Sequence, residues 1–480
     1  MKNTMKFPLK TSLSVLLSTL FLGACSSVAS YKAPLLDSNH VSTLPSAITS
    51  ESLQRGTPPA LWWKQFGDVQ LETLVELAWR NNYDLRTAVA RLSGSREQLQ
   101  VSQSALIPHA SLDAGSSHTK LAAIESRSGA STIVSPLQWQ MSLAWELDLF
   151  GRVRHSIEAA QASVEERSAL RDDVRRVILA HVVEAYLDLR GTQMLRASLQ
   201  AQVDNQTSSL KLIRDREIFG SASSSERLRF EAQLRLLSSR LPSLIAQERS
   251  ARNRLATLTG QRLDAPQLAL LDQPVPVNLP QTLMTDEPAQ LLLRRPDVKV
   301  AERAVAVATA REGIAYAELF PRISLSALFG SSGVAGNWLG GDASRWRVGA
   351  TSSWSLFDVG ARRAQFRAAG ADVQAAFANF DKVVAVAIEE TDTALSTWVQ
   401  LRKRNDELNI ALGLAQESVR LSRLRYDEGM ESLLNTLEAE RIALATDEQF
   451  ISAKRDLAIS TARSYFALAG GFDVGNAVSK

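Results

Sequence analysis

The chain has 480 residues, 45% of them hydrophobic and 22% charged, which is the composition of an ordinary folded protein. It carries 54 basic and 51 acidic side chains, but three of the lysines lie in the first 24 residues, which hold no acidic residue. The rest of the chain is therefore neutral and offers no support for a nucleic-acid partner, whose phosphates need a basic surface. Beyond those residues no run of 18 apolar residues occurs, which excludes an ordinary transmembrane helix.

Residues 1–24 have the three parts of a secretory signal: a basic start, a short apolar core and small residues at the end. Cys25 follows and is the only cysteine, so it can form no intramolecular disulfide. The sequence "LGAC" resembles the lipobox of bacterial lipoproteins, which implies cleavage before Cys25 and acylation of its thiol and its new N-terminus. Ser26, in place of Asp, is similar to the residue that directs lipoproteins to the outer membrane. Two or more acyl chains give stable anchoring.

Residues 25–60 are rich in Ser, Thr and Pro and lack periodicity, which predicts a lipidated and loosely ordered arm. A first repeat is predicted at 61–260, and its clearest feature is a strand at 138–149. Odd positions of this strand are apolar and even positions are mostly polar, so one side is apolar and the other wet. The apolar side holds Trp139, Met141, Leu143, Trp145, Leu147 and Leu149.

This alternation would also suit a soluble sandwich, with the apolar side on a core. However, the strand is about as long as a tilted membrane strand of ~9–11 residues, and its tryptophans are spaced as interfacial aromatics are. We therefore expect Trp139, Leu143 and Trp145 to face lipid. A partner strand near 110–118 is less clear.

No residue forces a break between about 155 and 217, which predicts one helix of about 90 Å. Its apolar stripe steps by four and three through Leu199, Val203, Gln206, Leu210 and Ile213. Pro242 is expected to kink the return helix. Five of the 15 prolines lie within 261–290, which predicts a linker.

A second repeat is predicted at 291–470, followed by a tail at 471–480. Trp145 and Trp354 are 209 residues apart, as are Gly220 and Gly429, whereas Pro108 and Pro321 are 213 apart. The first half therefore carries about four extra residues between Pro108 and Trp145, which an exposed loop tolerates. Alternating strands recur in the second half, where Trp346 and Trp354 are expected to face lipid.

The long helix of the second repeat has two apolar stripes. One repeats that of the first half, and the other holds Ile410, Leu414, Leu421 and Leu424. Two seams suit a helix with a neighbour on each side, although a helix inside a globular bundle would look similar. Four strands per chain cannot close a membrane barrel, and open edges are not viable in lipid. A membrane role therefore requires several copies.

The sequences "WWKQFGDVQLETLVELAWRNNYDL", "WELDLFGR", "LLLRRPDVKVAE", "AELFPRISL", "WSLFDVGARR" and "LRYDEGMESLLNTLEAERIAL" occur in this order across nearly the whole mature chain. Together they resemble the TolC-like outer-membrane efflux proteins, in the lipoprotein branch called NodT. The resemblance implies an α+β membrane protein. Its two repeats of long helices with a β-hairpin would trimerise into a 12-stranded outer-membrane β-barrel and a periplasmic α-helical barrel.

The same resemblance implies a function in the outer membrane of a Gram-negative bacterium. The homotrimer would be the exit duct of a tripartite pump, with a periplasmic adaptor and an inner-membrane transporter as partners. It would conduct small toxic molecules or drugs passively. No cofactor is expected apart from the lipid on Cys25. Tips that contact the adaptor are expected at Phe219, Gly220, Ser221, Glu428, Gly429 and Met430.

The resemblance also assigns a periplasmic gate. An acidic residue that rings the closed mouth in the family falls on Glu438, where Glu replaces the usual Asp. A second acidic position falls on Asn435, beside Leu434, so one acidic ring is expected. Tyr426 and Arg423 are candidates for the contacts that hold the inner helix pair. The alternative for Glu438 is a solvated helix face, where most glutamates lie.

No enzyme chemistry is predicted. The five histidines lack zinc-like spacing with one another or with Cys25, and no Gly-rich phosphate loop precedes a lysine. Two alternatives to drug efflux remain open. One is the exit duct of a protein-secretion system, which shares the architecture. The other is a lipid-tethered structural coiled-coil protein, against which the Trp-bearing strands argue.

Overall fold

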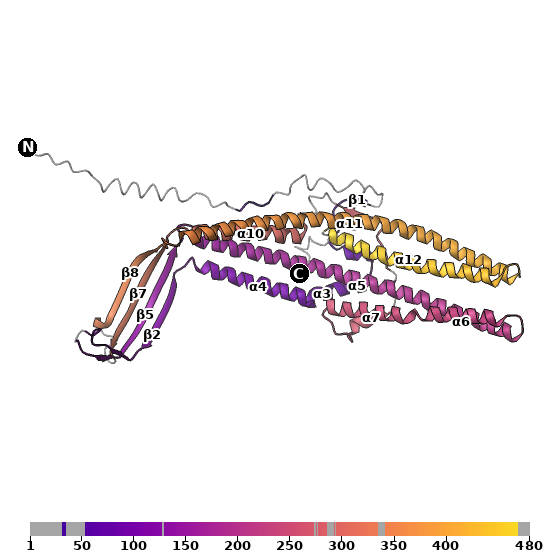
Figure 1. The fold of residues 1–480 in the computed structure, drawn as a ribbon, viewed down its shortest axis with the longest axis horizontal. Coiled ribbons are helices and arrows are strands. Elements are labelled where there is room, and N and C mark those ends of the chain that lie inside the picture. The colour runs from indigo at the N-terminus through magenta and orange to yellow at the C-terminus, as the bar shows by residue number, and fades with distance from the viewer. Residues whose placement is uncertain are drawn as a thin grey trace, which may run out of the picture. The chain divides into compact units, whose positions relative to one another are not determined.

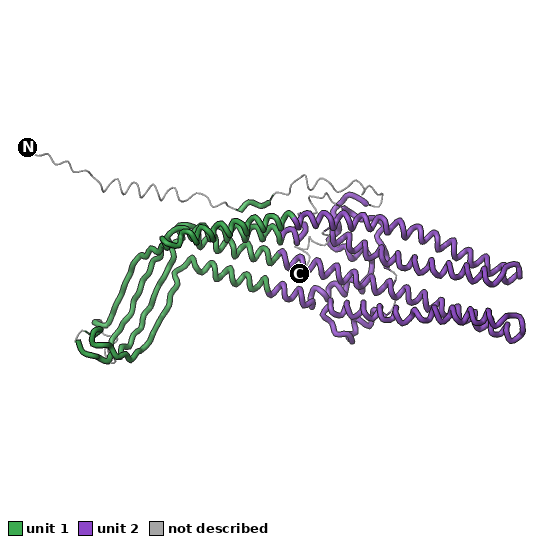
Figure 2. The backbone as a smooth tube through the Cα atoms, viewed as in Figure 1, with its two compact units in different colours: residues 1–34, 91–168, 300–381 green, residues 35–90, 169–299, 382–480 purple. Residues whose placement is uncertain are grey.

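The computed structural model describes residues 31–34, 53–126, 129–272, 275, 277–285, 292, 294–334 and 341–468. Cys25, the leader and the tail 471–480 lie outside these described residues. The chain divides into two compact units, shown in Figure 2: unit 1 has residues 1–34, 91–168 and 300–381, and unit 2 has 35–90, 169–299 and 382–480. Each unit thus takes segments from both predicted repeats.

Unit 1 contains an antiparallel sheet of four strands, which lie side by side in Figure 1 in the order β2 (His109–Ser116), β5 (Pro136–Leu147), β7 (Arg322–Val334) and β8 (Ser344–Ser353). The two predicted hairpins are β2–β5 and β7–β8, and pairing between β5 and β7 joins the halves. Within the described chain, β2 and β8 have no strand on their outer edges. A small pair, β3 (Thr119–Leu121) and β4 (Thr132–Val134), lies in the longer first connection.

Two predicted strand ends are wrong. The strand predicted at 138–149 runs from Pro136 to Leu147, so Leu149 lies beyond it. It ends because the carboxylate of Asp148 accepts the backbone N–H groups of Val153 and Arg154, both at 2.9 Å, which turns the chain into the next helix. Trp354 also follows its strand, since β8 ends at Ser353.

Long unbroken helices follow the hairpins. α5 (Arg152–Ile218) has 67 residues and α11 (Val359–Asp427) has 69, which corresponds to about 100 Å each at 1.5 Å per residue. Shorter helices, α4 (Tyr83–Ser104) and α10 (Pro296–Ala317), precede the first strand of each hairpin. Within the described part of the chain, none of the helices combines the length and the hydrophobicity needed to cross a membrane.

The return helices differ between the halves. In the second half α12 (Leu433–Ala467) is continuous, whereas in the first half α6 (Ser224–Ser238) and α7 (Leu241–Leu258) are separate helices. The effect of Pro242 is therefore a full break instead of the predicted kink. Pro242 lies in the first turn of α7, where its missing N–H costs nothing, and it could not continue the hydrogen-bond ladder of α6.

The main core of unit 2 gathers around the middle of α5. Trp62 and Phe66 of η2 (Trp62–Phe66), leucines of α3 (Val69–Asn81) and of α7, and the end of α12 pack there, with Trp62 stacked on Tyr465 at 5.2 Å between ring centroids. The predicted linker takes part as well. It contains α8 (Pro266–Ala269), η3 (Leu270–Asp272) and β6 (Leu283–Thr285), which pairs in parallel with β1 (Leu53–Arg55).

The packing of this linker differs from the expectation of a spacer. Leu268, Leu271 and Leu283 lie between its prolines and are all at most 2% exposed. Their burial contributes to the hydrophobic core. Pro266 begins α8, and the buried leucines hold the segment in the core of unit 2.

The internal repeat is visible as equivalent hydrogen bonds. The Trp145 indole N–H donates to the carbonyl of Leu106 at 3.1 Å, and the Trp354 indole donates to the carbonyl of Leu319 at 3.2 Å. These pairs are related by the offsets of 209 and 213 found in the sequence. Each indole ties the end of a hairpin to the turn that precedes the hairpin.

Two mid-helix glycines give a testable contrast. A Cβ on Gly191 of α5 would lie 2.3 Å from Cγ of Arg455 on α12, whereas a Cβ on Gly413 of α11 would meet nothing within 4 Å. We expect Gly191→Ala to lower the free energy of unfolding by about 1–3 kcal/mol through overpacking. Gly413→Ala should raise it by ~0.5–1 kcal/mol, because alanine loses less backbone entropy in a helix.

Both purified variants are unfolded with urea in detergent, and the loss of helix is monitored by far-ultraviolet circular dichroism. Equal shifts in the same direction would show that α5 and α12 do not meet closely at Gly191.

Candidate functional site

The four-stranded sheet of unit 1 has a continuous apolar face. Register places Leu112, Met141, Phe329 and Trp346 in one row across all four strands. The neighbouring row is Ala110, Leu143, Ala327 and Val348. Trp346 is 75% exposed and Leu112 is 71% exposed. An apolar surface of this extent on a single chain indicates a binding or membrane surface.

The opposite face of the sheet is polar. One row pairs Asp113 with Gln140, and Arg345 donates to the Gln140 side-chain oxygen at 3.1 Å. Ser111 and Ser142 are paired in the next row. The alternation is not perfect, because Leu328 lies in the row of Ser142 and Ser331 lies in the row of Trp139. A largely apolar side opposite a largely polar side is still the pattern of strands that separate lipid from an aqueous lumen.

The strand residues predicted to face lipid lie on the apolar face or next to it. Trp139 packs edge-on against Phe329 with 5.5 Å between ring centroids. Leu143 lies in the second apolar row, and Trp145 is paired with Leu325. Trp354 lies just past the end of β8 and is half exposed.

Both helix turns predicted as tips are present and have the same geometry. Gly220 and Gly429 both have φ of 74°, a conformation that glycine adopts without strain. The residue after each glycine donates its N–H five residues back, to Arg216 and to Arg425, both at 2.8 Å. This pairing closes the last helical turn, as in a Schellman motif. Phe219, 84% exposed, and Met430, 68% exposed, project from the tips.

The two turns lie at the same end of unit 2, as Figure 2 shows, and Tyr426 connects their hairpins. Arg216 of α5 donates to the Tyr426 hydroxyl, and its guanidinium lies 5.5 Å from the centroid of the Tyr426 ring. Arg423 makes a different link, to Glu440 of α12 at 2.7 Å. Tyr426 thus holds α11 to α5, and Arg423 holds α11 to α12.

An apolar cluster near the tips also connects the two helical hairpins. Leu210 and Ile213 of α5 surround Phe230 of α6, and Leu433 and Leu437 of α12 pack on them. Neither Phe230 nor Arg216 was predicted from the sequence. Phe230 is the only aromatic residue of α6, which is a usable signal, whereas nothing distinguishes Arg216 among its charged neighbours.

The predicted gate residues lie at the start of α12. Glu438 is exposed and forms an ion pair with Arg441 at 2.6 Å. Its hydrogen bond to Arg441 holds the pKa of Glu438 below the usual 4.5. The backbone N–H of Asn435 donates to Oγ of Ser432, which caps the helix, and the side chains of Asn435 and Leu434 are exposed. Within one chain, Glu438 is a solvated, paired residue.

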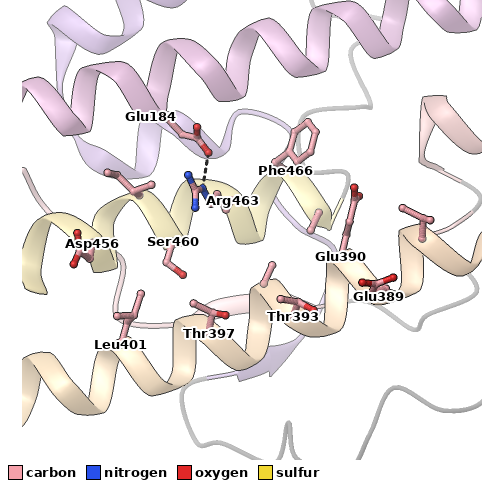
Figure 3. A pocket seen from close by; sticks show the side chains of 14 residues that line it. Glu184, Glu389, Glu390, Thr393, Thr397, Leu401, Asp456, Ser460, Arg463 and Phe466 are labelled. Carbon is pink, nitrogen blue, oxygen red and sulfur yellow. Dashed lines mark hydrogen bonds and ion pairs between the residues drawn. The ribbon is translucent and has the colours of Figure 1, made fainter. Parts of the chain in front are cut away.

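A cavity of about 840 Å³ lies elsewhere in unit 2, between α11 and the end of α12 (Figure 3). Its carboxylates include Glu184, which pairs with Arg463 at 2.9 Å, and Glu390, which pairs with Arg295 at 2.5 Å. Serine and threonine hydroxyls line it without an imidazole beside them. Among the described residues, no three His, Cys, Asp or Glu side chains are grouped to hold a metal ion.

Arg295 lies in the sequence "RRPD" and is 2% exposed. It donates to Asp297 at 2.6 Å and to Glu390 at 2.5 Å, and to the carbonyl of Ala467 at 3.2 Å. Arg176 of α5 also pairs with Asp297, at 3.2 Å. The sequence singled out this motif but did not predict that it binds the end of α12.

Comparisons with known proteins cover nearly the whole chain. The family model described as outer membrane efflux protein matches residues 74–261 and 288–470. The outer membrane protein OprJ of Pseudomonas aeruginosa is 30% identical over 476 residues, 97% of both chains. Nodulation protein T of Rhizobium leguminosarum bv. trifolii is 27% identical over 423 residues, 86% of this chain and 88% of the relative. The solved outer-membrane channel OprN has a TM-score of 0.85 and 31% identity, and covers 93% of this chain and 100% of that one.

Proposed function

The chain belongs to the outer membrane efflux protein family, and from this premise we propose that three copies form one passive exit duct. The predicted family, efflux function, outer-membrane location and α+β channel fold are confirmed by the family match and the relatives. The trimer, its partners and the roles of single residues are our proposals.

The sheet of unit 1 is the observation that carries the proposed duct. Its apolar face suits lipid, but β2 and β8 have outer edges without a strand partner among the described residues, and such open edges are not viable in a membrane for one copy alone. Because neighbouring strands are antiparallel, β8 runs opposite to β2 and can pair with β2 of the next copy. Three copies of the four-stranded sheet then give a closed 12-stranded barrel with lipid outside and the polar face inside.

The long helices are consistent with a second part of the duct, a periplasmic tunnel. The extra stripe of α11 is exposed in one copy, with Ile410 at 60% and Leu414 at 69%. We propose that a helix of the neighbouring copy covers this stripe, so that the helices of three copies surround a periplasmic tunnel. The tips would meet a periplasmic adaptor, which connects the duct to an inner-membrane transporter. The duct conducts small toxic molecules or drugs and performs no catalysis.

Two measurements test this function. The purified full chain should migrate as a trimer without boiling and as a monomer after boiling, and it should open conducting channels in planar bilayers. Removal of the protein from its bacterium should increase cellular retention of ethidium and leave the set of secreted proteins unchanged. A monomer without conductance would contradict the duct, and loss of a secreted protein with normal ethidium efflux would support a secretion system instead.

For the gate, we propose that the three Glu438 side chains meet near the axis of the resting trimer. Carboxylates close together repel, and a bound cation relieves this repulsion. They also attract cations into a narrow mouth. Opening would require loss of the contact between Tyr426 and Arg216, which holds the two hairpins of one copy together.

Glu438→Ala is expected to weaken block by multivalent cations added on the periplasmic side, and to lower cation preference. Basal conductance should change little, because closure rests on helix packing. Single-channel recording in planar bilayers measures all three quantities. Glu417→Ala is the matched control, since Glu417 forms the same exposed pair, with Arg420 at 2.7 Å. Equal effects of both variants would contradict the gate role and show that Glu438 is an ordinary solvated residue.

We also propose that Cys25 carries the lipid, a proposal that rests on the sequence because Cys25 lies outside the described residues. Cys25→Ser should leave an uncleaved or unlipidated precursor. Function should fall only in part, since a trimeric barrel is itself an anchor. Radiolabelled palmitate measures the modification, and label entering the Ser variant would contradict the assignment.

A further inference from the structure

Tyr31 lies in the short described part of the N-terminal arm, residues 31–34, which belongs to unit 1 (Figure 2). The Tyr31 hydroxyl donates to the carboxylate of Glu302 on α10. Arg303, the next residue of α10, donates to the Tyr31 oxygen at 3.4 Å, and its guanidinium lies 5.3 Å from the centroid of the Tyr31 ring.

Apolar and ionic contacts complete this docking site. The Tyr31 ring packs against a buried cluster formed by Ala162 of α5 with Ala306 and Val307 of α10. Glu165 of α5 holds Arg303 by an ion pair at 2.6 Å. The site is therefore built by two helices and is fixed independently of the arm. We infer that Tyr31 is a docking residue, which fastens the arm to α5 and α10 and limits how far the lipid on Cys25 can reach.

The state of the Tyr31 hydroxyl fits this role. Burial raises the pKa of Tyr31, and the adjacent carboxylate of Glu302 raises it further. The hydroxyl therefore stays protonated and keeps its donor proton throughout the physiological pH range. The docking contact is a hydrogen bond to a carboxylate, a class that is stronger than bonds between neutral groups.

The short chain between Cys25 and Tyr31 limits where the lipid can lie once Tyr31 is docked. Six Cα–Cα steps lead from Cys25 to Tyr31, so the two Cα atoms can lie at most about 20 Å apart. Along α10, the 15 residues from Glu302 to Ala317 cover about 22 Å. The sheet follows, since β7 begins at Arg322. At full extension a docked arm can therefore bring Cys25 to within a few ångströms of the end of α10, and the acyl chains on its thiol can span the rest.

This placement rests on the proposed membrane role of the sheet and on the proposed lipidation. The docking itself depends on neither. If both hold, Tyr31 keeps the acyl chains at the membrane surface beside the copy to which they belong.

Limited trypsin digestion of the full lipidated protein tests the docking. Lys32 is exposed and is followed by Ala33, so its peptide bond can be cut once the arm leaves its site. Proteolysis then reports the population of the released arm. Tyr31→Ala should increase the rate of cleavage at Lys32 by roughly tenfold or more. Tyr31→Phe should give a smaller increase, because the ring contacts remain.

Tyr83→Ala is the matched control. Tyr83 is 60% exposed at the start of α4, with an arginine 6.0 Å from its ring. This variant should leave cleavage at Lys32 unchanged. A wild-type rate in Tyr31→Ala, or equal acceleration in both alanine variants, would overturn the docking.

A shortened tether tests the placement of the lipid. Deletion of Ser27, Val28 and Ala29 leaves three steps, about 10 Å, between Cys25 and Tyr31. In membranes the anchored variant should be cut at Lys32 about tenfold faster, because it cannot both dock and reach the bilayer. The same deletion with Cys25→Ser, exported by an ordinary cleavable leader, should be cut slowly.

Slow cleavage of the anchored deletion variant would overturn the placement. Palmitate labelling of that variant shows separately whether lipidation has occurred. Failure of the lipid assignment is thereby distinguished from failure of the placement and of the docking.

Discussion

Leu143→Arg is expected to prevent assembly of the trimer in the outer membrane. Leu143 lies in the second apolar row of the sheet, between Ala110 and Ala327. If this row faces lipid near the bilayer midplane, an arginine costs about 2–4 kcal/mol per copy. Three copies carry the same change, so the penalty on the trimer is threefold. The measurement is the fraction of outer-membrane protein that migrates as a trimer on unboiled gels.

Ser142→Arg provides the control on the adjacent residue. Ser142 points to the polar face, where its row ends at Arg347 on β8. An arginine there would lie in the aqueous lumen, and we expect assembly close to wild type with altered conductance. Equal loss of trimer in both variants would show that the strand is buried on two sides, as in a soluble domain.

Arg295→Ala is expected to lower the free energy of unfolding by about 3–5 kcal/mol, the range for breaking a buried ion pair. The substitution leaves Asp297 with one basic partner, Arg176, and Glu390 without its buried partner. It also removes one of the two side-chain donors to the last carbonyl of α12, at Ala467, and leaves only the hydroxyl of Thr391. Urea unfolding of the purified protein measures the loss.

Arg262→Ala is the surface control for this variant. Arg262 pairs with Asp264 at 3.1 Å, but both side chains are more than 70% exposed. Such a pair contributes about 0–1 kcal/mol. A loss from Arg295→Ala no larger than that from Arg262→Ala would show that the buried cluster is not a structural tie.

The same cluster gives a pH dependence. Burial opposes ionisation of Asp297, but hydrogen bonds from Arg295 and the charge of Arg176 outweigh it, so its pKa lies below the usual 3.8. Because the folded pKa is lower than the unfolded one, this carboxylate stabilises the protein fully above about 3.8 and loses the effect as the pH falls further. In Arg295→Ala this acid-sensitive contribution should be smaller.

Several features followed from the sequence because they depend on short stretches of chain. The period-two pattern of residues 138–149 is a local property of a strand, and the structure places its odd residues from Trp139 to Leu147 on one face. The turns at Gly220 and Gly429 follow from the freedom of glycine at positive φ. The offset of 209 residues is arithmetic on the sequence, and equivalent hydrogen bonds of Trp145 and Trp354 now accompany it.

The ends of the strands were harder to predict, and the cause is again a local contact. Leu149 continues the apolar alternation, yet the strand ends before it, because Asp148 binds backbone donors five and six residues ahead. A capping contact of this kind competes with strand pairing and leaves the hydrophobic pattern unchanged.

By itself, the sequence determined the two-faced strands, the long helices, the repeat and the family. Only the tertiary structure decided which polar side chains meet: Arg295 with Glu390, Arg216 with Tyr426, and Tyr31 with Glu302. These partners lie 95, 210 and 271 residues apart, so their pairing depends on the register of distant helices. Hydrophobic periodicity fixes which face of a helix is buried, but it leaves open which turn of its neighbour each polar side chain will face.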